Sequence, residues 1–66
     1  MRREIIENYV RKDVCLILVG QTIKDGVAFR IDSIGEEEIA VTSIDGEVRG
    51  HIEMEMITAI FETVEK

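Results

Sequence analysis

The stretch DVCLILV, residues 13–19, decides the fold, because six of its seven residues form an unbroken apolar run. A run of this length, apolar on both of its alternating faces, predicts a strand that is covered on both sides. One cover is expected to be the interior of a small barrel. The other is expected to be either the preceding helix or a neighbouring subunit. Cys15 lies inside the run and is interpreted as a small buried hydrophobic side chain rather than a reactive thiol.

The composition of the 66-residue chain favours β structure around this strand. Ile and Val together number eighteen, against two Leu and three Ala, and side chains branched at Cβ pack better on a pleated sheet than in a helix. The length fits one domain, residues 1–66, and excludes large enzyme folds. A chain this short buries only about 60% of its unfolded surface. Its single Cys cannot form an internal disulfide, so self-association is expected to supply stability.

The residues before the strand, 2–12, predict a short helix. Ile5 and Tyr9 are four residues apart, as are Ile6 and Val10, and together they form one apolar stripe. A helix of about ten residues is unstable alone in water. The stripe is therefore expected to pack on the sheet.

Three further strands follow from alternating apolar residues. The alternation indicates strands at 27–32, 39–44 and 48–56. Asp45-Gly46, between the last two of these strands, is typical of a hairpin turn.

The last segment, 57–64, fits either helical or extended spacing. Its branched side chains favour a fifth strand that follows a tight turn near residues 54–57. The predicted fold is therefore mainly β, with the short helix 2–12 followed by a strongly bent, five-stranded antiparallel small barrel at 13–64.

Residues 14–32 resemble a motif of a known family. Its elements are the alternating Val14, Leu16 and Leu18, a turn at Gly20, and Gly26 six residues before Asp32, which follows the apolar Ile31. This spacing resembles the first motif of the Sm-like family, which includes the Sm, LSm and Hfq proteins. The resemblance implies a small Sm-like or SH3-like barrel, with Gly20-Gln21 as the first hairpin turn and Gly26 permitting a bend in the second strand. Another SH3-like or PRC-type barrel is the alternative.

The resemblance also implies a homo-oligomer. Sm-like proteins assemble by pairing the fourth strand of one subunit with the fifth strand of the next. A chain without proline, as here, lacks one common device that protects sheet edges from pairing. A ring or another closed homo-oligomer is therefore expected. The expected interface residues are Ile52, Met54, Met56, Thr58, Ala59, Ile60 and Phe61.

RNA is the second partner that the resemblance implies. Asp32 would orient a loop or accept a hydrogen bond from a base, and Arg49 would stack on a base or bind phosphate. The dipeptide Arg49-Gly50 is similar to part of the second motif of the family. The candidate nucleic-acid contacts are Asp32, Ser33, Arg49 and Gly50, with Arg2, Arg3, Arg11 and Lys12 adding attraction to the phosphate backbone.

The charge distribution opposes RNA binding. Residues 1–12 carry four bases and two acids, a net +2, whereas residues 13–66 carry four bases and twelve acids, a net −8. Nucleic-acid binders usually present a basic surface. Glu36 also falls where the family usually has an asparagine, and a carboxylate repels phosphate. Two functions therefore stay open: a homo-oligomeric Sm-like module that binds RNA, and an acidic protein-interaction or assembly module that does not.

Catalytic, metal and membrane functions have no supporting pattern. One His and one Cys on different strands form no nucleophilic dyad, so no catalytic residue, no cofactor and no enzymatic activity is expected. His51, Glu53 and Glu55 alternate along one strand about 6.6 Å apart, too far for comfortable chelation, so no metal is expected. The longest apolar run has six residues, against about 20 for a membrane span. No targeting segment is recognised, and a cytoplasmic location is expected.

Overall fold

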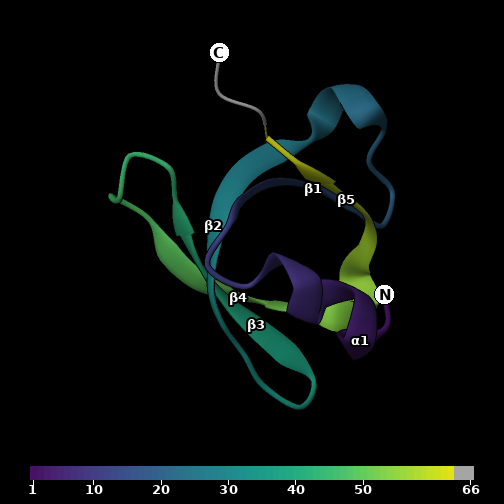
Figure 1. Cartoon of the computed structure of the whole chain (residues 1–66). Coiled ribbons are helices and arrows are strands. Elements are labelled where there is room, and N and C mark those ends of the chain that lie inside the picture. Colours follow the sequence, from purple (N-terminus) through teal and green to yellow (C-terminus); the bar gives the residue numbers. More distant parts are fainter. Residues whose placement is uncertain (64–66) are drawn as a thin grey trace.

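The computed structural model describes residues 1–63 of the chain. Five antiparallel strands form one sheet in the order β4-β3-β2-β1-β5, and a short helix precedes them. The sheet curls strongly, and α1 lies against its inner side (Figure 1). In chain order the elements are α1 (Arg3–Ile6), η1 (Glu7–Tyr9), β1 (Asp13–Leu18), η2 (Ile23–Asp25), β2 (Val27–Ile34), β3 (Glu38–Ser43), β4 (Arg49–Glu53), η3 (Met54–Met56) and β5 (Ile57–Glu62).

The predicted mainly β fold with five antiparallel strands is confirmed. In this order β4 and β5 are the two edges of the sheet, and within residues 1–63 no strand pairing joins them. The sheet is therefore open rather than closed into a barrel by its own hydrogen bonds. The fifth strand is confirmed for 57–62 over its helical alternative, whereas Val64 lies outside the described residues.

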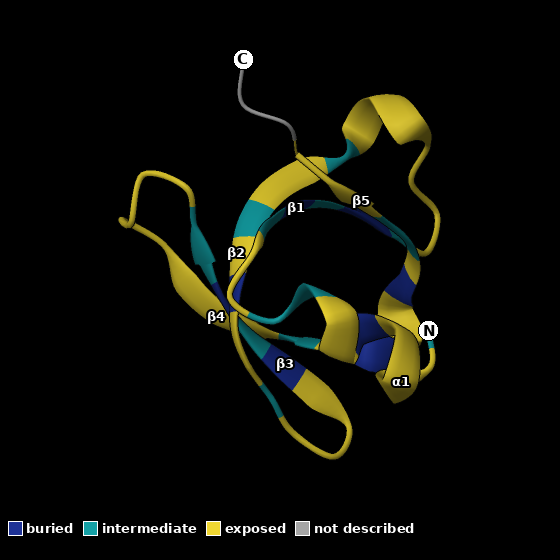
Figure 2. Ribbon diagram, in the orientation of Figure 1, coloured by how far each residue is buried: buried dark blue, intermediate teal, exposed yellow. Residues whose placement is uncertain are grey.

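The hydrophobic core lies on the inner side of the curled sheet (Figure 2). It combines residues from both ends of the chain, because β1 pairs with β2 on one side and with β5 on the other. Leu16, for example, is only 1% exposed and lies directly between Val27 and Ile60. The core cluster consists of Ile6, Val14, Leu16, Ile31, Ile39, Val41, Met54 and Ile57.

The N-terminal helix is shorter than the predicted 2–12. One α-helical turn, Arg3–Ile6, continues into the 3-10 turn Glu7–Tyr9. Arg11 then adopts a positive φ of 67°, and its N–H donates to the carbonyl of Ile31 at 2.6 Å. The helix has to end here because the chain reverses to enter β1. Ile6 fills the core as the stripe predicts, but Ile5 remains 45% exposed.

The link between β1 and β2 differs from the predicted hairpin. Gly20 does turn the chain, with φ of +84°, but a 3-10 turn, η2, follows before β2 begins at Val27. Gly26 therefore precedes the second strand rather than bending it. A Cβ on Gly26 would lie 2.5 Å from the Sγ of Cys15, so the glycine allows close approach of the link to β1. Cys15 itself is half-buried, not buried as predicted.

The fourth strand is also shorter than predicted. The alternation of 48–56 continues beyond the point where the chain turns, since β4 ends at Glu53 and η3 makes the tight turn into β5. Met54 consequently points into the core, whereas Met56 is 42% exposed. The predicted turn at Asp45-Gly46 is confirmed: Gly46 has φ of +81° and donates its N–H to the carbonyl of Ser43.

Candidate functional site

Three predicted nucleic-acid residues gather on the outer face of the sheet. Ile31 and Val41 point into the core, so the residues that alternate with them face outward. Thr42 lies directly opposite Arg30 on one side and Arg49 on the other. In the next row Ser33, Ala40 and His51 lie opposite one another. The outer face of β2, β3 and β4 thus presents Asp32, Ser33, Arg30, Arg49 and His51 together.

Asp32 owes its position to a β-bulge. The register between β2 and β3 shifts between Ile31 and Ser33, which leaves Asp32 as the extra residue. Its carboxylate accepts a hydrogen bond from the hydroxyl of Thr42. The bulge therefore turns Asp32 toward the middle of the outer face, beside the row that contains Arg49.

The two arginines of the outer face, Arg30 and Arg49, differ in their ion-pair partners. Arg30 pairs with Asp13 across β1 and β2, with 3.0 Å between Nε and Oδ1. Arg49 is exposed and takes no part in the ion pairs found among residues 1–63. Gly50 lies opposite Val41, so it contributes main-chain atoms only.

The four N-terminal bases lie on other elements than Arg49. Arg2 and Arg3 belong to the α1 segment, which covers the inner side of the sheet (Figure 1). Arg3 pairs with Glu7 at 3.4 Å, and Lys12 pairs with Glu62 at 3.6 Å. Arg11 occupies the turn into β1. The eight predicted nucleic-acid contacts are therefore divided between the outer face, the helix and the turn.

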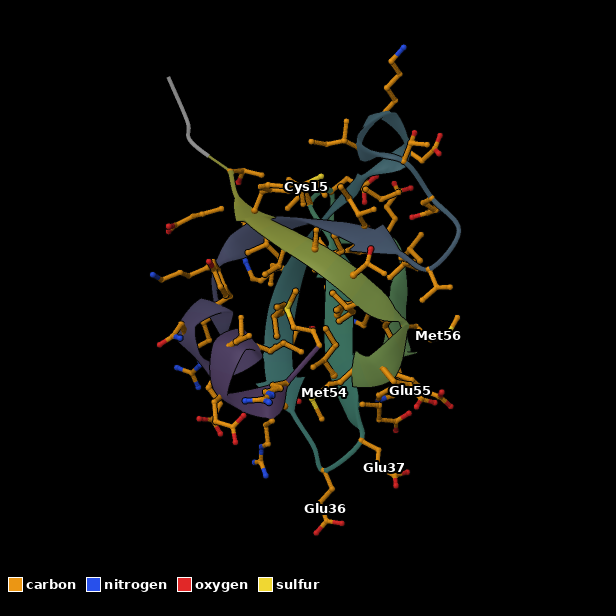
Figure 3. The ribbon with its side chains drawn as sticks, turned by 90° about the vertical axis from the view of Figure 1, so that its right-hand side faces the viewer. Cys15, Glu36, Glu37, Met54, Glu55 and Met56 are labelled. Atoms are coloured by element: carbon orange, nitrogen blue, oxygen red, sulfur yellow. The ribbon has the colours of Figure 1, made fainter. Side chains whose placement is uncertain are left out.

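A shallow acidic depression lies between α1, the loop joining β2 to β3, and η3. Its volume is about 500 Å³, and in Figure 3 Glu36 and Glu37 project from the loop while Glu55 projects from η3. Sequence reasoning missed this depression, since its walls combine the N-terminal segment, the loop between β2 and β3, and η3, which are separated in the sequence. The lining residues are Met1, Arg2, Arg3, Glu36, Glu37, Glu53, Met54 and Glu55.

The predicted interface residues occupy different environments. Met54 is in the core of its own chain, whereas Phe61 and Met56 are 45% and 42% exposed. Thr58 donates its hydroxyl to the carbonyl of Ile17 at 3.0 Å. Ile52, Ala59 and Ile60 are half-buried. Phe61 and Met56 are therefore the large apolar members of the set that are exposed to a partner.

The turn between β3 and β4 holds a carboxylate that accepts two hydrogen bonds. The hydroxyl of Ser43 and the N–H of Glu47 both donate to the carboxylate of Asp45. These hydrogen bonds favour the charged form, so they lower the pKa of Asp45 below its ordinary value. Within residues 1–63, no group of three His, Cys, Asp or Glu side chains is arranged to hold a metal ion.

Comparisons of the chain with protein-family models, with curated proteins and with solved structures found no match. Among residues 1–63 no helix is long and apolar enough to cross a membrane.

Proposed function

We propose that this chain is a homo-oligomeric Sm-like assembly module whose subunits associate through the edges of the curled sheet. The observation that supports this function is the strand order β4-β3-β2-β1-β5, which leaves two edge strands without partners within residues 1–63. An open edge presents unpaired main-chain N–H and C=O groups, which form hydrogen bonds readily with another strand. The strong curl of the sheet also agrees with the bent small barrel that the Sm-like resemblance implies.

The small core adds a second reason for association. Nine hydrophobic residues are buried among residues 1–63, and domains of this size usually need a disulfide, a metal or a partner for stability. Cys15 is a free thiol. Several large apolar side chains stay exposed, among them Val48 at 61% and Phe61 at 45%. Burial of these side chains between subunits would contribute the missing apolar contacts.

The test of assembly is the molar mass in solution. Size-exclusion chromatography with light scattering, run across a hundredfold range of protein concentration, is expected to give a mass above the 7.5 kDa of one chain. A constant mass of one chain at every concentration would overturn the proposal. Circular dichroism of the same samples checks that the protein is folded.

RNA binding is the second candidate function, and the grouping of Asp32, Ser33 and Arg49 on one face favours it. The four glutamates that line the depression together with Arg2 and Arg3 weigh against it, because cations near the phosphates supply much of the affinity for nucleic acid. The charge distribution therefore favours a protein partner over a nucleic acid.

Titration with U-rich and A-rich RNA oligomers at two salt concentrations tests this second function. If RNA binds through the outer face, Arg49→Ala weakens binding and reduces its salt dependence. Lys24→Ala, which removes an exposed cation from η2, is the matched control and should leave binding unchanged. Absence of binding at low salt would eliminate RNA and leave the assembly function.

A further inference from the structure

The geometry points to a two-fold dimer in which β4 pairs antiparallel with β4 of a second copy, centred on His51. This inference rests on the proposed association through sheet edges, but it assigns the contact to β4 alone, in place of the pairing of β4 with β5 that the Sm-like resemblance implies. Its basis is the five-residue strand Arg49–Glu53, an edge of the sheet whose side chains on the outer face are Arg49, His51 and Glu53. All three are exposed.

The first observation is the direction of the main-chain groups of β4. Ser43 donates its N–H to Val48, and Met54 donates its N–H to Glu37, each at 2.8 Å. In an antiparallel pair, residues that bond to the neighbouring strand alternate with residues that do not. Gly50 and Ile52 therefore bond to β3, and the N–H and C=O groups of residues 49, 51 and 53 point to the free edge.

The second observation is the order of charges along that edge. In a two-fold antiparallel pair centred on His51, Arg49 lies directly opposite Glu53 of the second copy. By symmetry Glu53 lies opposite Arg49 of the second copy, so two ion pairs form. Opposite charges in direct cross-strand pairs stabilise a sheet, and like charges destabilise it.

The single chain leaves these charges without compensation. Glu53 lies directly opposite Glu38 on β3, which is a repulsive pair. Arg49 lies opposite the neutral Thr42. A second β4 would place an arginine on the open side of Glu53 and a glutamate on the open side of Arg49. Both edge charges would then have partners of opposite sign.

The register follows from the length of the strand. Two-fold pairings centred on Gly50, His51 or Ile52 all allow the free N–H and C=O groups of one β4 to bond to those of the other. Only the pairing centred on His51 places every residue of Arg49–Glu53 opposite a residue of the same strand. Centring on Gly50 puts Arg49 opposite the second copy's His51, and centring on Ile52 moves Arg49 beyond the end of the second strand.

The inner face of the strand accepts the same pairing. Gly50 has open space where a Cβ would stand, with nothing within 4 Å. In the pairing centred on His51, Ile52 of the second copy lies opposite Gly50. The half-buried Ile52 side chain would cover that space, and a two-fold axis repeats the contact.

The other edge strand fits β4 less well. On the outer face β5 presents Ala59 and Phe61, which lie opposite Ile17 and Cys15 of β1. Neither of these side chains carries a charge that could form an ion pair with Arg49 or Glu53. Charge complementarity therefore favours β4 with β4 over β4 with β5.

A site-specific crosslink tests the two-fold axis. His51→Cys, made in the Cys15→Ala background, places two thiols in a hydrogen-bonded cross-strand pair with Cα atoms about 5.5 Å apart, which is within the range for a disulfide. Mild oxidation is expected to give a covalent dimer on a non-reducing gel. The matched control is Arg49→Cys in the same background. Its Cα atoms would be at least about 14 Å apart in this register, and it should stay uncrosslinked.

Reversal of the two charges tests the register independently. Arg49→Glu and Glu53→Arg each convert two attractive pairs into repulsive ones, so each is expected to raise the dimer dissociation constant about tenfold or more. The double variant restores both ion pairs and should return within about threefold of the original value. Lys24→Glu is the control for charge alone. Glu53→Arg also relieves repulsion from Glu38, so loss of folding would not explain weaker association.

The outcomes separate this inference from the proposed function. An oligomer by light scattering that gives no His51→Cys crosslink, or whose charge reversals fail to compensate, overturns the β4 two-fold and leaves assembly intact. A protein that has the mass of one chain at all concentrations overturns both. Crosslinking together with compensation supports association through a sheet edge and assigns it to β4 with β4 rather than to β4 with β5.

Discussion

Replacing Gly26 with alanine is predicted to destabilise the fold through a steric clash with Cys15. The backbone of Gly26, at φ −56° and ψ 136°, is one that alanine adopts freely, so the backbone alone favours alanine by about 0.4–1 kcal/mol. The added Cβ, however, would lie 2.5 Å from the Sγ of Cys15. Overpacking of this kind costs about 1–3 kcal/mol. The net loss expected for Gly26→Ala is about 1–2 kcal/mol.

A double-mutant cycle isolates this contact. Urea unfolding at one fixed protein concentration gives the free energy of unfolding for Gly26→Ala, Cys15→Ala and the combined variant. Because Cys15→Ala removes the sulfur, the combined variant should be more stable than the sum of the two single effects predicts, by about 1 kcal/mol or more. Gly50→Ala, where nothing lies within 4 Å of the new carbon, is the control. Additive effects, or a Gly26→Ala protein as stable as the original, would refute the close approach.

Three further predictions concern stability. Ile6→Ala should cost about 2–4 kcal/mol in urea unfolding, because Ile6 is fully buried and is the residue by which α1 fills the core. Arg30→Ala removes the partner of Asp13 in a largely exposed ion pair and should cost less than about 1 kcal/mol, with a smaller effect at high salt. Asp45→Asn should show a pH-dependent loss: hydrogen bonds from Ser43 and Glu47 lower the pKa of Asp45 in the folded state, so its carboxylate stabilises the fold above about pH 4. That contribution is lost as the pH falls further, and the stabilities of Asp45→Asn and the original protein should converge in acid.

The elements that could be predicted from the sequence are those set by local alternation. DVCLILV (residues 13–19) and the turn at Asp45-Gly46 identify the central strand and the β3–β4 hairpin, since period-two burial and turn chemistry involve neighbouring residues only. The end of β4 could not be predicted in this way. The alternation continues through Met54 and Met56, whereas the chain turns at η3 so that Met54 enters the core.

The features that could not be predicted from the sequence depend on contacts between residues that are far apart in the chain. Gly26 resembles a bend glycine in a family motif, yet its close neighbour is Cys15, eleven positions earlier. The outer face can be predicted in part, because the resemblance to the first Sm-like motif points to Asp32 and Ser33. The bulge that orients Asp32, and its hydrogen bond from Thr42, depend on pairing with β3. The acidic depression needs the helix, the loop and η3 in place.

The proposed pairing of β4 with the β4 strand of a second copy depends on both the sequence alternation and the sheet topology. The alternation of Arg49–Glu53 shows that its three polar side chains share a face, but in a central strand that face would meet two neighbours of the same chain. The strand order makes β4 an edge, and the hydrogen bonds of Val48 and Met54 show which main-chain groups are free. With the edge and its free groups known, the order Arg49, His51, Glu53 is self-complementary. A two-fold axis reverses this order in the second copy, so that arginine lies opposite glutamate. A single Arg49→Glu substitution would then lose two ion pairs, one on each side of the axis, which is why charge reversal tests the hypothesis sharply.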